Sequence, residues 1–120
     1  MTNVPIIRIE NALIVSLHGH ITDRQFQKLQ EHLARTLGKT GAKAIIFDAS
    51  NLPYIDAYIA DVFNQVIRNA RVYNTPVLLC GIQPAVALIM AEMHISPGNV
   101  KTFFTLDDAL AFLKNRVVPN

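Results

Sequence analysis

The sequence predicts an α/β domain with a mainly parallel central sheet that opens with an antiparallel β-hairpin. Short apolar runs of strand length alternate with amphipathic stretches, and turn or capping residues separate them. Hydrophobic residues make up 51% of the 120 residues, so one domain over residues 1–120 can bury a core without metal or disulfide. The predicted order is β-β-α-β-α-β-α-β-α, with four helices.

The first half of the chain is predicted to form a hairpin, a helix and a central strand. Residues 5–9 and 12–17 are β-prone and are joined by a short turn. Thr22 and Gln25 have the spacing of a capping box, which starts a helix expected to end near Gly38 or Gly41. Its apolar stripe consists of Phe26, Leu29, Leu33 and Leu37. Residues 44–47 are nearly all apolar, which is typical of a strand covered on both faces.

The second half repeats a helix–strand alternation. Asp56 or a neighbour is expected to cap a helix whose apolar positions are Ile59, Val62, Phe63, Val66, Ile67 and Ala70. Residues 76–80 predict a buried strand, and Pro84 then suits the first turn of a third helix. Residues 100–104 predict the last strand, and Thr105 and Asp108 a capping box for the fourth helix. Residues 116–120 are expected to be a frayed tail.

Charge and composition exclude several classes of function. Eleven Lys and Arg oppose nine Asp and Glu, and no basic cluster is evident along the sequence, so nucleic acid is not an expected partner. No apolar run reaches the roughly 20 residues that span a bilayer, which predicts no membrane association. The single cysteine and the lack of a signal-peptide pattern predict a cytoplasmic location.

The chemistry-bearing residues do not form a convergent set. Asp48 and Asp56 flank the polar segment after the third strand, where carboxylates suit acid–base work, but turn closure and helix capping are the favoured roles. His18 and His20 would share a strand face without further ligands nearby. Cys80 would need a lowered thiol pKa to act as a nucleophile. The sequence therefore predicts a protein that is not an enzyme, with no catalytic residue, metal site or cofactor. Of the functions considered, a small α/β enzyme is the least favoured.

The predicted element order and three sequence blocks carry a family resemblance. The blocks are Pro-Ile-Ile at 5–7, Ile-Asp-Ala-Tyr-Ile-Ala at 55–60 and Gly-Ile-Gln-Pro-Ala-Val-Ala at 81–87. With Asp48 at the end of a buried strand, the chain resembles the STAS domain of anti-sigma-factor antagonists, and within it the small stressosome scaffold proteins. The resemblance covers essentially the whole chain.

The resemblance implies a non-catalytic scaffold that assembles with RsbR-type STAS paralogues, through a homodimeric building block, into a large complex. It also implies that the scaffold sequesters an RsbT-type serine/threonine kinase until a serine is phosphorylated. That serine falls on Ala57 here, and a second family threonine falls on Cys80. Both hydroxyls are missing, so the switch is expected to be locked unphosphorylated.

Two explanations of Ala57 remain open: a replacement introduced to hold the unphosphorylated state, and a natural loss of the switch. The resemblance places the kinase and partner surface at Asp48, Ser50, Tyr54, Asp56, Ala57, Tyr58 and Asp61. Ser50 is also an alternative phosphate acceptor. The competing reading is a ligand-binding STAS module that takes a nucleotide or anion at the helix start near Asp56.

Overall fold

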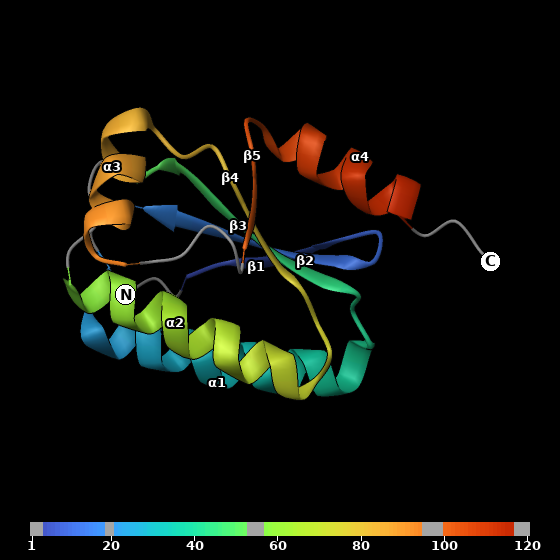
Figure 1. The fold of residues 1–120 in the computed structure, drawn as a ribbon. Helices are drawn as coiled ribbons and strands as arrows, with labels where there is room; N and C mark the ends of the chain where they lie inside the picture. Colours follow the sequence, from blue (N-terminus) through green and yellow to red (C-terminus); the bar gives the residue numbers. More distant parts are fainter. Residues whose placement is uncertain (1–3, 19–20, 53–56, 95–99, 117–120) are drawn as a thin grey trace.

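The computed structural model describes residues 4–18, 21–52, 57–94 and 100–116. Within these ranges, five strands and four helices follow one another in the predicted order (Figure 1). The strands form one sheet in the order β1-β2-β3-β4-β5, in which only the first pair is antiparallel. The predicted mixed sheet that opens with a hairpin is therefore confirmed.

The N-terminal hairpin consists of β1 (Ile6–Ile9) and β2 (Ala12–His18). Its two-residue turn is tight, and Glu10 adopts a φ of 54° there. Helix α1 (Asp23–Thr40) then begins at the predicted capping box, in which Thr22 and Gln25 exchange hydrogen bonds of 2.8 and 3.1 Å. Gly41 ends the helix with a left-handed φ of 63°.

The central strand is longer than the sequence indicated. Strand β3 (Ala44–Asn51) continues four residues beyond the predicted end at residue 47. The polar residues of this extension pair with β2 on one side, since Ser16 faces Asp48 and His18 faces Asn51 in the register. Strand pairing thus extends into a segment whose polarity suggested a loop.

The remaining elements agree with the predictions except at their ends. They are α2 (Ala57–Val72), β4 (Val77–Cys80), α3 (Pro84–Glu92), β5 (Lys101–Phe103) and α4 (Leu106–Arg116). The last strand is three residues long, and Phe104 lies beyond it with 86% of its surface exposed. Arg116 ends α4, so the predicted tail begins one residue too early; residues 117–120 lie outside the described ranges.

The strand order explains which face of the sheet each helix covers. Helices α1, α2 and α3 connect parallel neighbours in one direction across the sheet, and right-handed crossovers then place them all on one face. Helix α4 follows the last strand and packs on the other face, as Figure 1 shows for α4 opposite α1 and α2. The sheet therefore has a three-helix face and a single-helix face.

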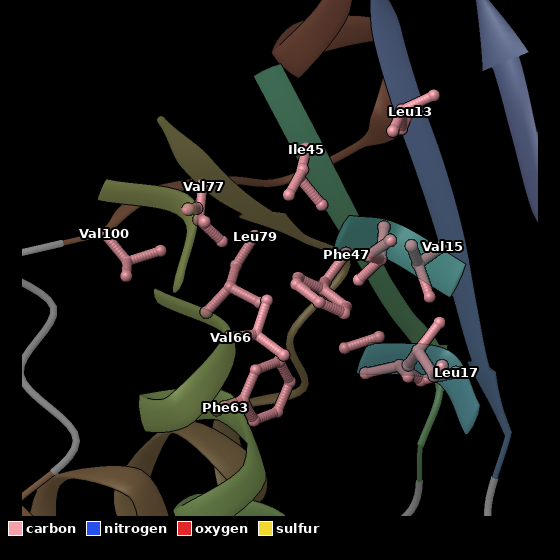
Figure 2. Close-up of a cluster of buried hydrophobic side chains, with 14 of the residues drawn as sticks. Leu13, Val15, Leu17, Ile45, Phe47, Phe63, Val66, Val77, Leu79 and Val100 are labelled. Atoms are coloured by element: carbon pink, nitrogen blue, oxygen red, sulfur yellow. The ribbon is translucent and has the colours of Figure 1, made fainter. Parts of the chain in front are cut away.

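The larger core lies between the sheet and α1, α2 and α3. Figure 2 shows Phe47 on β3 facing Phe63 on α2, with ring centroids 5.2 Å apart in an edge-to-face arrangement. The predicted stripe of α1 is fully buried there. Phe63, Val66 and Ala70 confirm the predicted apolar face of α2.

The smaller core lies beneath α4. Ala109, with no exposed surface, packs in one cluster with Ile14, Ile46, Leu78 and Cys80 from the sheet. These strand residues alternate with those of the larger core, as period-2 strand geometry requires. The sheet is packed between the two clusters. The polar residues at the end of β3 lie at the carboxyl edge of this sheet.

Candidate functional site

Hydrogen bonds between its own residues stabilise the polar end of β3. The Asp48 carboxylate accepts hydrogen bonds from the Ser50 backbone N–H at 3.0 Å and from the Ser50 hydroxyl at 2.6 Å. The β2–β3 register shifts in the same place, because three steps along β3 match two along β2. The half-buried Asp48 thus positions the exposed Ser50 at the carboxyl edge of the sheet.

Gly81 lies against this turn. It follows β4 with a left-handed φ of 73°, and a Cβ at this position would collide with the Ser50 hydroxyl oxygen. Its backbone N–H donates to the Phe103 carbonyl at 3.2 Å, and the Gln83 side-chain amide reaches the Ser50 carbonyl at 3.4 Å. The loop before α3 therefore packs on the end of β3.

Cys80 is buried beside Asp48 and has no exposed surface. Burial, and then the Asp48 carboxylate, raise the pKa of its thiol to about 12. A thiol with this pKa is protonated at neutral pH, so Cys80 lacks the lowered thiol pKa that a nucleophile would need.

Helix α2 begins at Ala57, and Asp61 is exposed one turn further along. The Asp61 carboxylate accepts from the Gln65 side-chain amide at 2.7 Å. The Gln65 oxygen in turn accepts from the Gln30 amide of α1 at 3.0 Å. This chain of amides ties the start of α2 to α1 and holds Asp61 in place.

The structure places part of the predicted surface on two consecutive elements. Asp48 and Ser50 share the turn that ends β3, and Ala57 and Asp61 lie in the first turns of α2, the next element. Tyr54 and Asp56 lie outside the described residues, as do the side chains of Ala57 and Tyr58. Asp48 and Asp61 are therefore placed, whereas Asp56 and the side chains of Tyr54 and Tyr58 are not.

The metal reading gains no support from the described residues. His18 is exposed at the end of β2, and His20 lies outside the described ranges. Among the described side chains, no three potential ligands of the His, Cys, Asp and Glu types come together.

Sequence reasoning missed the roles of Gly81, Gln83 and the Gln30–Gln65 pair. In the sequence, Gly81 is marked only as the first residue of the 81–87 block, but its contact with Ser50 joins residues 31 positions apart. Polar glutamines on amphipathic helices resemble ordinary solvated residues. No local signal marks these pairings, because they depend on strand order.

Hydrogen bonds fix two carboxylates in the described part of this segment. Asp48 already accepts two hydrogen bonds from Ser50, and Asp61 accepts one from Gln65. Carboxylates fixed in this way present negative charge at set positions, which suits a basic docking partner.

Comparison with known proteins gives a family match over most of the chain. The STAS domain model matches residues 3–109. RsbRA of Bacillus subtilis strain 168, an RsbT co-antagonist, is 25% identical over 109 residues. That match covers 90% of this chain and 40% of RsbRA, so the chain spans about two fifths of the length of this relative.

Two solved structures resemble the chain over nearly its whole length. A serine-to-glutamate variant of RsbS from Moorella thermoacetica is 27% identical, with a TM-score of 0.85 over 96% of this chain and 97% of that one. A structure of the stressosome, described as a signal integration and transduction hub, is 26% identical, with a TM-score of 0.86 over 96% and 100%. In the described residues, no helix combines the length and apolarity that crossing a bilayer requires.

Proposed function

The chain belongs to the STAS domain family, and from this membership we propose that it is an RsbS-type scaffold of a bacterial stressosome without catalytic activity. It assembles with RsbR-type STAS proteins and sequesters an RsbT-type serine/threonine kinase. The observation that carries the proposal is the likeness to RsbS, at 27% identity and a TM-score of 0.85 over 96% of the chain. The 25% identity to RsbRA, an RsbT co-antagonist, supports the choice of kinase.

The proposed kinase-docking surface is the carboxyl edge of the sheet and the start of α2. Its described acidic groups are Asp48 and Asp61, both held by hydrogen bonds, with the exposed Ser50 beside Asp48. Tyr54, Asp56 and Tyr58 complete it as predicted from the sequence. Such a surface attracts a basic partner by charge complementarity.

Ala57 is proposed to occupy the regulatory position. A phosphate on a serine there would add about −1.5 to −2 charge within a turn of Asp61, and it would change the surface by repulsion and by new acceptor oxygens. Alanine accepts no phosphate, so this scaffold remains in its kinase-binding state. The two origins of Ala57 predict the same behaviour in a purified protein.

Cys80 is proposed to occupy the second family position, and its burial restricts what that position can do. A threonine there would lie beneath α4 with no exposed surface, as the thiol does. A kinase would reach its hydroxyl only after this part of the single-helix face opens. Modification at residue 80 is therefore expected to be slower than at residue 57.

The proposal is tested by restoring the acceptor. Ala57→Ser is incubated with an RsbT-type kinase and ATP, and phosphate is located by mass spectrometry. The expected result is one phosphate on residue 57 and release of the kinase, with no phosphate on the parent chain. Adding Ser50→Ala to both proteins serves as the control, because Ser50 is the alternative acceptor in the same surface.

Assembly is tested in parallel by sizing the chain alone and with an RsbR-type partner. A dimer alone and a much larger particle with the partner are expected, in keeping with a cytoplasmic complex. Failure to bind both the paralogue and the kinase would overturn the proposal. Tight nucleotide binding by calorimetry would favour the ligand-binding alternative instead.

A further inference from the structure

The solvent-facing side of α1 carries a continuous row of positive groups. This basic stripe consists of Arg24, Lys28, His32, Arg35 and Lys39, all of which are exposed. These residues are spread over 16 positions of the sequence, and the helix brings them onto one face. Steps of three and four residues place the five side chains on one face, opposite the buried apolar stripe of the same helix.

Like charges recur one turn apart along the basic stripe. Arg24 and Lys28 are one turn apart, as are Arg35 and Lys39, and like charges at this spacing cost a few tenths of a kcal/mol per pair. Among the residues that the structure describes, the side chains of Lys28 and Arg35 have no ion-pair partner. Glu31 is the acidic side chain between Lys28 and Arg35, so the stripe keeps a net positive charge, which is complementary to an acidic partner.

A shallow hollow beside the basic stripe offers a binding site for a side chain of that partner. Its volume is about 340 Å³, and three of its lining side chains are Lys28, His32 and Arg35. Val4 and Leu29 contribute apolar wall, and Glu31 is the one acidic side chain in its lining. The hollow can take an extended side chain that carries a carboxylate.

The residue types of the basic stripe favour an acidic protein over two other anionic partners, a membrane surface and single-stranded nucleic acid. A membrane-surface helix inserts an apolar face into the lipid, but the apolar face of α1 is buried in the core. Single-stranded nucleic acid is bound through aromatic stacking in addition to charge, and the stripe has no aromatic side chain other than His32, while the net charge is only +2. Carboxylates presented by a protein need neither feature.

We propose that the basic stripe of α1 is a docking surface for an acidic segment of a partner protein. The stripe extends about 22 Å along the helix, at 1.5 Å per residue. It uses none of the residues assigned to kinase docking, so this inference stands or fails separately from the proposed function. Binding through it is expected to weaken with added salt, because the charges are exposed.

The test measures binding of the full chain to poly-L-glutamate at low salt. The variant Arg24→Glu, Lys28→Glu and Arg35→Glu reverses three charges of the stripe. The matched control, Arg8→Glu, Lys43→Glu and Lys114→Glu, makes the same change in net charge at exposed sites outside α1. The expected result is at least tenfold weaker binding for the stripe variant and less than threefold for the control.

Circular dichroism verifies that both variants fold, and Arg24→Gln, Lys28→Gln and Arg35→Gln replace the reversal if it does not. Duplex DNA and vesicles containing phosphatidylserine are measured as competing probes. Equal losses in the stripe variant and control, no binding by the parent chain, or tighter binding to DNA or vesicles than to poly-L-glutamate would each overturn the proposal. Salt-sensitive self-association lost only in the stripe variant would also overturn it, since the occupant would then be a second copy.

Discussion

Gly81 is a residue for which the structure predicts a clear mutational effect. Gly81→Ala would strain a backbone φ of 73° and drive its Cβ against Ser50, whose backbone nitrogen lies 3.0 Å from that position. The expected loss is about 1–3 kcal/mol in the free energy of unfolding, measured by urea denaturation.

Gly41 supplies the matched control for Gly81. Its φ is 63°, but a Cβ there would meet no atom within 4 Å. Gly41→Ala therefore has only the left-handed backbone cost, about 1 kcal/mol. If the two variants lose equal stability, the close packing of Gly81 on the β3 turn is not important.

The Cys80 thiol gives a prediction for pH. Its pKa is raised to about 12 in the folded protein from a reference value of 9.0, so folding favours the protonated thiol. This contribution to stability is complete below about pH 9 and is lost as the pH rises toward about 12, because the unfolded chain releases the proton first.

The measurement compares the parent with Cys80→Ala by urea denaturation at neutral pH and at about pH 10. The parent should lose stability relative to the variant at the higher pH, since other titrating groups are common to both. A thiol reagent at pH 8 should label the parent only after urea unfolds it. Rapid labelling of the folded protein would contradict the burial of Cys80.

Individual residues were predictable where local chemistry decides their role. Thr22, Gln25 and Gly41 act as the sequence indicated, because capping depends on residues within a few positions. The contact of Gly81 with Ser50 was not predictable from local patterns, because it depends on β3 and β4 being neighbours in the sheet.

The start of α1 is the best-defined helix end, and its cap can be tested directly. Thr22→Ala removes the oxygen that accepts from the Gln25 backbone N–H at 3.1 Å. A loss of about 1 kcal/mol in unfolding free energy is expected.

Thr105→Ala provides the comparison at α4, where the Asp108 backbone N–H donates to the Thr105 hydroxyl at 3.1 Å. If α4 unfolds together with the rest of the domain, Thr105→Ala should lower the free energy of global unfolding by a similar amount to Thr22→Ala. A much smaller effect would indicate that α4 detaches before the main transition.

Strand ends were the weakest predictions among the elements. The polar residues of β3 read as a loop, yet backbone pairing with β2 continues through Asn51. Residues 100–104 read as a full strand, yet β5 pairs with β4 only over Lys101–Phe103. Backbone hydrogen bonds decide where strands end, and side-chain polarity reports them only indirectly.

The two-faced packing of the domain can be tested with neighbouring leucines of β4. Leu78 packs in the α4 cluster and Leu79 in the larger cluster, and both are 2% exposed. Either change to alanine should lower the unfolding free energy by about 2–5 kcal/mol.

The two leucine variants should differ in the exposure of Cys80. Leu78→Ala loosens the face that covers the thiol, so a thiol reagent should label Cys80 faster than in Leu79→Ala. Equal labelling rates in the two variants would show that α4 does not protect the thiol independently of the larger core.

The architecture as a whole was predictable because alternating elements and right-handed crossovers leave few arrangements. The polar surface was predictable only in part. Asp48 and Asp61 are marked by sequence position and are held by nearby residues, but Gln30 and Gly81, which pack against those neighbours, are distant in the sequence. The basic stripe follows from the helical spacing of its residues, although acidic and apolar residues separate them in the sequence.

The sheet order β1-β2-β3-β4-β5 also bears on how the protein is made. Each strand after β1 pairs with the strand synthesised just before it, so its first partner has already left the ribosome when it emerges. Among the described strands, none is inserted later between two strands that already pair. The strand order therefore allows the sheet to grow from the N-terminal hairpin outward during translation.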